Sequence, residues 1–191
     1  MGSGLFERVC VTTEDDGIAA VSTRHGASVI SRRREMAGDD VPLIPVVLDF
    51  IENEEHEGRT YDELCVLMAT APMRNAQDIR DVMALLKPGT CEFSMAVTEY
   101  GLSPHQALIA DNNGTLRAAW PELVNKQEQD VPKYLCDNGS TYGFIVDGLK
   151  REKTFYGKTL KGHVMPRRRS VDLNEPEDME ILELFAGSSN S

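Results

Sequence analysis

The chain contains 191 residues, 41% of them hydrophobic and 27% charged, which is enough for one domain with a substantial core. No window is apolar enough to predict a membrane span, and the net charge of −11 argues against nucleic acid as a partner, although a small phosphate ligand needs only a local basic patch. The 4 cysteines form no CxxC pair and no secretory signal begins the chain, so we expect a cytoplasmic protein without structural zinc.

Strand-like and helix-like periodicities alternate from the beginning of the chain. The first half predicts a strand, a helix, a strand, a helix and a strand at residues 8–13, 15–25, 27–30, 42–51 and 64–69. The first three form a βαβ unit, in which Gly26 ends the helix. Residues 64–69 are apolar throughout, which predicts a central parallel strand that is buried on both faces.

The second half of the chain continues this alternation. It predicts a helix at 76–86, a strand at 92–98 and a β-hairpin whose arms, 107–110 and 115–118, flank the turn sequence DNNG. We expect residues 187–191 to form a frayed polar tail. Because no repeat or linker marks a second domain, the sequence predicts a single α/β domain with a mostly parallel sheet.

The first candidate binding segment follows the predicted strand 64–69. It contains Thr70, Ala71, Pro72 and Arg74. In open α/β sheets ligands bind beyond the carboxyl ends of the strands, so backbone N–H groups, a hydroxyl and a guanidinium here suit a nucleotide. The alternative is an ordinary strand-to-helix turn capped by Thr70 and Pro72.

The second polar segment, residues 129–142, contains the sequences QDVPKY and DNGSTY. We interpret DNGSTY as a glycine-containing loop that enters an apolar strand. The amide and hydroxyl groups of the segment suit a polyhydroxylated ligand, and a surface turn is the alternative.

The third segment, residues 164–178, has the sequence VMPRRRSVDLNEPED. A short apolar strand is expected to place Asp172 and Asn174 on one face, because side chains alternate with period two, and Pro176 then opens a helix. Two oxygen ligands on one face suit Mg²⁺ that bridges phosphates. The alternative is that Asp172 caps the final helix.

Seven segments spread over residues 3–185 form a series. They are SGLFERVCVTTEDDGIA (3–19), RRREMAGDD (32–40), IPVV (44–47), ATAPMR (69–74), AVTE (96–99), QDVPKYLCDNGSTY (129–142) and VMPRRRSVDLNEPED (164–178). In this order they resemble the cytidylyltransferases that activate nine-carbon acidic sugars, the CMP-sialic acid synthetase family with its pseudaminic and legionaminic acid branches. The resemblance implies a three-layer, mostly parallel α/β sheet like that of the nucleotide-diphospho-sugar transferases.

The resemblance also implies an enzyme that binds CTP and Mg²⁺ and acts as a homodimer. The anomeric hydroxyl of the sugar would attack the α-phosphate in line, giving a CMP-sugar and pyrophosphate, and such a reaction depends mainly on positioning and charge neutralisation. Asp172 and Arg32 would act in catalysis, and Asp172 would bind the metal with Asn174. The remaining residues divide into a nucleotide-binding set, Thr70, Ala71, Pro72 and Arg74, and a sugar-binding set, Gln129, Asn138, Gly139 and Tyr142.

One part of the family pattern has no counterpart in the sequence. The family opens with a strand and a glycine-rich basic phosphate loop, of the form ARGGSK…RKN, whereas residues 1–4 here already correspond to the end of the following helix. We therefore interpret residues 1–186 as a cytidylyltransferase-like domain without its first βα unit. Loss of that interior strand would leave neighbouring backbone groups unpaired, at roughly 1–3 kcal/mol for each buried group.

Two explanations of this departure remain open. Either Met1 is an internal methionine and the enzyme starts upstream, or the chain is a truncated, non-catalytic remnant that binds sugar or a partner subunit. We favour the first, because the downstream segments form a coherent core and a coherent site.

Smaller departures concern the metal and the sugar. Asn174 stands where the family has an aspartate, which keeps an oxygen ligand but removes a charge. The arginine expected before Gln129 is replaced by Gln127 and Glu128. ATAP and IPVV are closer to the pseudaminic branch, whereas DNGSTY is closer to the sialic and legionaminic branches, so the motifs do not select one sugar.

Other conspicuous residues have simpler interpretations. Residues 52–57 (ENEEHE) look like a metal cluster but are expected to be the solvated end of the preceding helix. The arginines at 167–169 suit a phosphate or the sugar carboxylate, or else form a surface basic run. Trp120 and Tyr134 are expected to be packing anchors, with a dimer contact as one setting for them.

Overall fold

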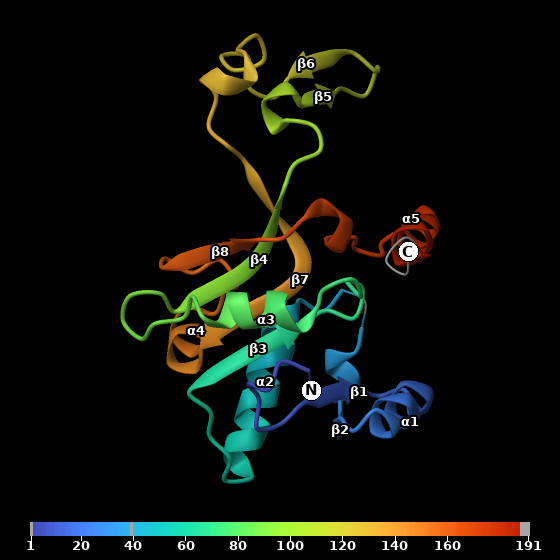
Figure 1. Cartoon of the computed structure of the whole chain (residues 1–191), viewed down its shortest axis with the longest axis vertical. Coiled ribbons are helices and arrows are strands. Elements are labelled where there is room, and N and C mark those ends of the chain that lie inside the picture. Colours follow the sequence, from blue (N-terminus) through green and yellow to red (C-terminus); the bar gives the residue numbers. More distant parts are fainter. Residues whose placement is uncertain (1, 39, 188–191) are drawn as a thin grey trace. The chain divides into compact units, whose positions relative to one another are not determined.

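The computed structural model describes residues 2–38 and 40–187 of the chain (Figure 1). The described residues fall into two compact units. Unit 1 takes its residues from Met1–Val66, Asn75–Ser94 and Thr141–Lys161, and unit 2 takes its residues from Leu67–Arg74, Met95–Ser140 and Gly162–Ser191. Of the predicted polar tail, Gly187 is the last residue of the final helix, and residues 188–191 lie outside the described residues.

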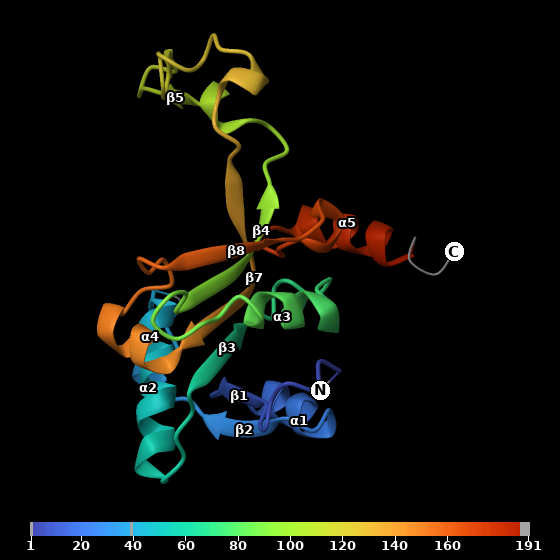
Figure 2. The same cartoon turned by 60° about the vertical axis from the view of Figure 1, so that its left-hand side comes forward.

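Unit 1 begins with the predicted βαβ unit, formed by β1 (Cys10–Thr13), α1 (Asp16–Arg24) and β2 (Ser28–Ser31) (Figure 2). The two strands pair in parallel, with Cys10 opposite Ser28. Asp15 starts the helix because its side chain accepts a hydrogen bond from the backbone N–H of Ile18 at 2.8 Å. The prediction of a βαβ unit from local signals is confirmed.

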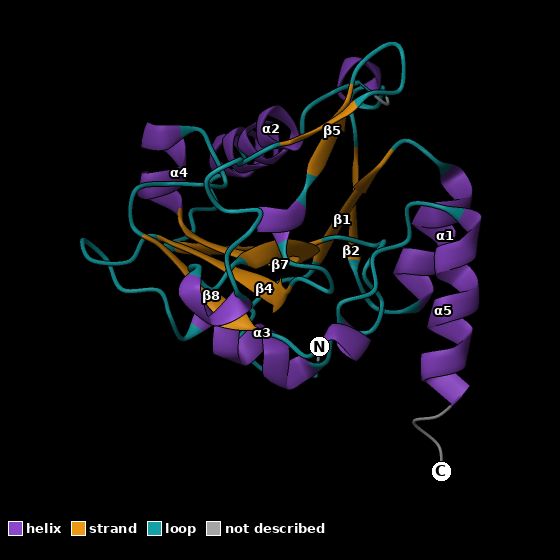
Figure 3. Ribbon diagram, turned by 90° about the horizontal axis from the view of Figure 1, so that it is seen from above, coloured by secondary structure: helices purple, strands orange, loops and turns teal. Residues whose placement is uncertain are grey.

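A second sheet contains four strands, in the order β3 (Glu63–Leu67), β7 (Leu135–Ile145), β4 (Phe93–Glu99) and β8 (Leu160–Val164). β3 lies at the edge of this sheet and all of its residues keep some exposure, so the prediction of a central strand buried on both faces at 64–69 is wrong. An apolar run does not by itself distinguish a central strand from an edge strand. The buried strand is β4, in which every residue except Glu99 is buried. In the chain, helices follow three of these strands, β3, β7 and β8, which fits the predicted α/β class (Figure 3).

The core of unit 1 gathers around Phe93 and Phe144, which are both fully buried. Their rings meet edge to face with centroids 6.0 Å apart. The later helices of this unit are α3 (Ala76–Met83) and α4 (Val146–Glu152). They supply Val82 and Leu149, which are also fully buried.

Helix α2 (Leu43–His56) is longer than predicted and ends with a motif that reverses the chain. Gly58 has a left-handed φ of 76°. Its N–H donates to the carbonyl oxygen of Glu55, and the N–H of Arg59 donates to that of Glu54, both at 2.9 Å. This is the Schellman pattern of a helix C-terminus, and it returns Arg59 to the side chain of Glu54.

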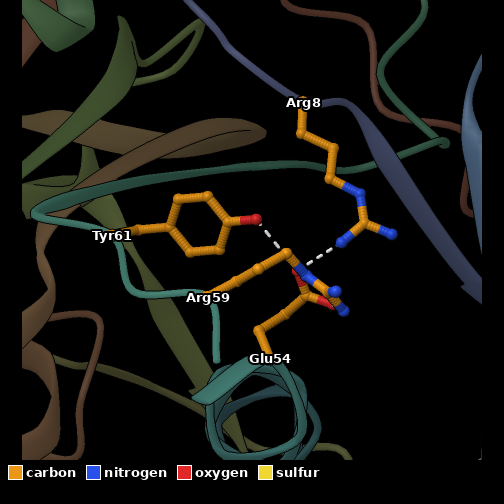
Figure 4. Close-up of polar contacts among 4 residues, drawn as sticks. All are labelled: Arg8, Glu54, Arg59 and Tyr61. Atoms are coloured by element: carbon orange, nitrogen blue, oxygen red, sulfur yellow. Dashed lines mark hydrogen bonds and ion pairs between the residues drawn. The ribbon is translucent and has the colours of Figure 1, made fainter. Parts of the chain in front are cut away.

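The carboxylate of Glu54 lies at the centre of a polar cluster (Figure 4). Arg59 donates to both of its oxygens at 2.8 and 2.9 Å, Tyr61 donates its hydroxyl at 2.9 Å, and Arg8 forms an ion pair with it. These interactions, that of Arg59 foremost, outweigh burial and lower the pKa of Glu54 to about 2. The Glu54 side chain is 3% exposed, so the prediction of a solvated helix end at 52–57 is wrong for this residue.

Unit 2 contains the predicted β-hairpin of β5 (Leu108–Ala110) and β6 (Leu116–Ala118), which pair antiparallel. Asp111 holds the turn, because its side chain accepts the backbone N–H groups of Asn113 and Thr115 at 2.8 and 2.9 Å. Figures 1 and 2 show the hairpin within the long connection between β4 and β7. Large apolar side chains of this connection are exposed, namely Leu102, Leu108, Ile109, Leu116 and Trp120.

The last helix of unit 2, α5 (Pro176–Gly187), starts at Pro176 as predicted. Short 3₁₀ helices lie between the main elements, at η1 (Arg34–Met36), η2 (Pro104–Gln106), η3 (Glu128–Asp130) and η4 (Arg167–Arg169). Within the described ranges, no helix combines the length and the apolar character needed to cross a membrane.

Candidate functional site

Gly139 and Asp172 approach each other within unit 2 and form the centre of the candidate site. Residues 137–142 belong to the continuous strand β7, so the prediction of a loop before a strand is wrong. Gly139 has a φ of 65°, and the side chains of the two preceding residues accept the backbone N–H groups of Gly139 and Ser140 at 3.0 and 3.2 Å. These local bonds kink the strand. A Cβ atom at position 139 would lie 2.8 Å from Oδ2 of Asp172, so glycine is needed for this approach.

The two carboxylate oxygens of Asp172 have different surroundings. Oδ2 accepts a hydrogen bond from Nδ2 of Asn174 at 3.0 Å. Oδ1 is buried, and no residue that the structure describes donates a hydrogen bond to it. A buried acceptor without a donor costs about 1–3 kcal/mol, and more when it is charged, so an external partner is expected at this oxygen.

A hard divalent cation fits the donor set at Asp172. Magnesium is commonly held by one or two carboxylates, with substrate phosphates and water completing its shell. No group of three or more His, Cys, Asp or Glu side chains in the described part of the chain is arranged to hold a metal ion. A cation at Asp172 would therefore need further oxygen ligands from outside these side chains.

The segment that carries Asp172 is irregular rather than a strand. β8 ends at Val164 and the 3₁₀ helix η4 follows, so the prediction of a short strand that delivers Asp172 and Asn174 is wrong. The helix-cap alternative for Asp172 is wrong as well. Asp178 has that function, because its side chain accepts the backbone N–H groups of Asn174 and Glu175 at 2.8 and 2.7 Å, and these bonds lower its pKa.

The loop predicted to bind the nucleotide lies against the Asp172 segment. The backbone N–H of Leu173 donates to the carbonyl oxygen of Thr70 at 2.9 Å. Thr70 and Pro72 are exposed, whereas Ala71 is fully buried. Thr70 is therefore exposed, while its backbone is hydrogen-bonded to Leu173, the residue after Asp172.

Arg74 stabilises this loop through hydrogen bonds to its backbone. Its Nη1 donates to the carbonyl oxygens of Met68 and Ala71 at 2.6 and 2.7 Å, and to that of Ser140 at 3.3 Å. The N–H of Met68 also donates to the carbonyl oxygen of Ser140. Arg74 therefore links residues 68–71 to β7, and this nitrogen is directed at the protein backbone.

Asn138 is buried and connects β7 to the segment before Asp172. Its Nδ2 donates to the hydroxyl oxygen of Ser170 at 2.9 Å and lies 3.4 Å from Sδ of Met165. Its Oδ1 accepts from the backbone of Ser140. These bonds hold the kinked strand and the Asp172 segment together.

Three other predicted site residues have contacts of their own. Arg32 belongs to unit 1, where its Nη2 donates to the carbonyl and hydroxyl oxygens of Thr12 at 2.7 and 2.9 Å. Tyr142, also in unit 1, is buried and its ring packs against that of Phe155 at a centroid distance of 4.7 Å. Gln129 is exposed in η3 of unit 2. The residues that unit 2 does bring together are Thr70, Arg74, Asn138, Gly139, Asp172 and Asn174.

One contact of unit 2 was not predicted from the sequence. The guanidinium of Arg167 lies so close to Gly101 that a Cβ atom there would overlap it. A depression of about 250 Å³ is lined by Thr98, Glu99, Val164, Met165, Pro166 and Arg167. The run of three arginines was the available signal, but nothing in the spacing related it to Gly101.

The chain is similar in sequence to known cytidylyltransferases. No protein-family model matches the chain. Pseudaminic acid cytidylyltransferase of Campylobacter jejuni is 23% identical over 186 residues, covering 97% of this chain and 80% of that protein. CMP-N,N'-diacetyllegionaminic acid synthase of Legionella pneumophila is 28% identical over 186 residues, covering 95% and 78%. The chain is thus similar to these cytidylyltransferases over nearly its whole length.

A solved structure supports the same relation at the level of fold. CMP:2-keto-3-deoxy-manno-octonic acid synthetase complexed with CTP matches with a TM-score of 0.63 and 12% identity, covering 98% of this chain and 83% of that one. At this identity the match establishes the fold, which is the α/β nucleotidyltransferase fold that the sequence motifs predicted. The cytidylyltransferase homology and the fold therefore agree.

Proposed function

We propose that the protein is a CTP-dependent cytidylyltransferase that transfers CMP to a nine-carbon acidic sugar and releases pyrophosphate. The observation that carries the proposal is the buried Oδ1 of Asp172, which receives no hydrogen bond from any residue that the structure describes and lies beside Gly139 and the loop of residues 68–74. The relatives named for pseudaminic and legionaminic acid support the reaction class. Sialic acid is the third candidate sugar, on the sequence resemblance.

The reaction joins two anions, so the protein must position them and offset their charge. The anomeric hydroxyl forms a bond to the α-phosphorus while the bond from that phosphorus to the pyrophosphate oxygen breaks. Asp172 would hold Mg²⁺, which when bound neutralises phosphate charge. Loop 68–74 would present backbone groups and the Thr70 hydroxyl to the nucleotide, and Arg74 keeps that loop in shape.

The test is pyrophosphate release from CTP and Mg²⁺ with pseudaminic, legionaminic and sialic acids in parallel. We expect activity with one of the three and its loss in Asp172→Ala, with an unchanged circular dichroism spectrum. Asp147→Ala is the matched control, because Asp147 is an exposed carboxylate in the first turn of α4. Full activity of Asp172→Ala would refute the site.

Inactivity with all three sugars, both of this chain and of a folded version extended upstream of Met1, would refute the proposed function. A non-catalytic protein that binds sugar or a partner subunit would then be the remaining interpretation. Binding of CTP, measured by calorimetry in the same samples, would separate loss of the nucleotide site from choice of the wrong sugar.

We also propose that the β5–β6 hairpin supports a homodimer. Leu102, Leu108 and Leu116 are 85%, 56% and 60% exposed, and Trp120 lies on the same connection. Where such exposed apolar side chains lie close together, they commonly mark an interaction surface. A second copy of the chain offers the same apolar surface, which suits a symmetric contact.

A further inference from the structure

Asn174 occupies a position where the sequence suggested a metal ligand, yet its side chain faces Asp172. Nδ2 of Asn174 lies 3.0 Å from Oδ2 of Asp172. The amide nitrogen must be the atom at this distance, because an amide oxygen and a carboxylate oxygen have no proton to share and would repel each other. The contact is therefore a hydrogen bond donated by Asn174.

The donor is held on a fixed backbone. The N–H of Asn174 donates to Oδ2 of Asp178 at 2.8 Å, and the N–H of Glu175 donates to the same oxygen at 2.7 Å. Asn174 is thus attached at its backbone to the first turn of α5 and at its side chain to Asp172. Its amide cannot follow the carboxylate freely, so it sets the rotation of the Asp172 carboxylate.

The rotation matters because the two oxygens are not equivalent. Oδ2 faces Gly139 and receives the Asn174 amide, whereas Oδ1 is buried and receives no donor from the described residues. Without the amide, Oδ1 and Oδ2 could exchange places by rotation about the Cβ–Cγ bond. The amide therefore determines which oxygen is left for an external cation.

We propose that Asn174 is a positioning residue that orients Asp172 toward the cation, and not itself a ligand of that cation. This inference rests on the proposed function and deepens its account of the site. Replacing a group that orients a metal ligand through a hydrogen bond typically lowers metal affinity 10-fold to 100-fold. Asn174 is exposed and makes a single bond to Asp172, so the lower end of that range is expected.

The first test observes the hydrogen bond itself by NMR on ¹⁵N-labelled protein. The side-chain amide of Asn174, assigned by its loss in Asn174→Ala, should exchange slowly with solvent and should shift in Asp172→Ala. It should remain protected when Mg²⁺ and CTP are added. Collapse of the protection on adding Mg²⁺ and CTP would overturn the proposal, because the amide would then have turned its oxygen toward the cation.

The second test measures binding of Mn²⁺ in the presence of CTP by water-proton relaxation. Asn174→Ala should weaken binding about tenfold. Asn53→Ala is the matched control, because Nδ2 of Asn53 donates a comparable bond to Asp49 at 3.2 Å within unit 1, and its binding should be unchanged. Equal Mn²⁺ affinity in Asn174→Ala and the unsubstituted protein would overturn the positioning role alone. No Mn²⁺ binding by the unsubstituted protein would overturn the proposed function, and this role with it.

Discussion

Replacing Glu54 by glutamine removes the charge at the centre of its polar cluster and preserves the size of the side chain. The carboxyl group has a pKa of about 2 in the folded protein, against an ordinary value of 4.5. Each unit of this difference corresponds to about 1.4 kcal/mol, so the charged form stabilises the fold by about 3 kcal/mol at pH 7. The side chain is 3% exposed, so solvent screens this little. We expect Glu54→Gln to lower the free energy of unfolding at pH 7 by about that amount.

The stabilisation that Glu54 provides depends on pH. Because the pKa of Glu54 is lower in the folded protein, the unfolded chain binds the proton more readily as the pH falls. The stabilisation is complete above the unfolded value of 4.5 and is lost as the pH falls through about 2. At pH 3 about 1.4 kcal/mol of it remains, so the unsubstituted protein loses about 2 kcal/mol from this source between pH 7 and pH 3.

Urea unfolding followed by circular dichroism at pH 7, 5, 4 and 3 measures both effects. The difference between Glu54→Gln and the unsubstituted protein should shrink as the pH falls. Glu52→Gln is the control on the same helix, where the Glu52 side chain is 71% exposed, and it should change stability by less than about 0.5 kcal/mol. A difference that stays constant from pH 7 to pH 3, or one no larger than that of Glu52→Gln, would refute the reasoning.

Three further predictions concern unit 2. Gly139→Ala should lower the free energy of unfolding by about 2 kcal/mol, more than Gly114→Ala, because both have positive φ but only the alanine at 139 would meet a neighbouring atom, Oδ2 of Asp172; equal losses in urea unfolding would contradict the contact. Arg74→Met should speed hydrogen exchange of the amides at 68–73, since three carbonyl oxygens lose a donor, and unchanged rates by mass spectrometry would show that Arg74 does not hold the loop. If the proposed dimer forms through the hairpin, Leu116→Lys should shift it toward monomer in analytical ultracentrifugation, while an unchanged sedimentation coefficient would exclude this hairpin residue from the contact.

Features with local causes were predictable from the sequence. The βαβ unit follows from the cap at Asp15, the hairpin from the turn at Asp111, and the start of α5 from Pro176. In each case the decisive hydrogen bond or backbone restriction joins residues within four positions of one another. Physical chemistry at that range is visible in the sequence itself.

Features with distant causes were not predictable in the same way. One partner of the buried Glu54 is Arg8, 46 residues earlier, and no periodicity relates the two. Gly58 followed by Arg59 was the usable signal, since a glycine after a helix predicts a reversal of the chain. The edge position of β3 likewise depends on the pairing of strands that are far apart in sequence.

The candidate site contains features that the sequence predicted and features that it did not. The sequence motifs named Asp172, Gly139 and the segment 69–74, and the structure brings these into contact within unit 2. Nδ2 of Asn174 and Nη1 of Arg74 donate to protein atoms, and the sequence motifs did not predict these partners. A residue type indicates which bonds a side chain can make, but its partners depend on the fold.

Arg74 orders the loop at 68–71 before any ligand binds. Its guanidinium gathers carbonyl groups from residues 68–71 and from Ser140, so the backbone of the loop is ordered during folding. Ordering a residue costs about 1–2 kcal/mol of backbone entropy, and these hydrogen bonds take part of that cost before any ligand binds. Such preorganisation favours rapid association, with little rearrangement of the loop between the free and bound states.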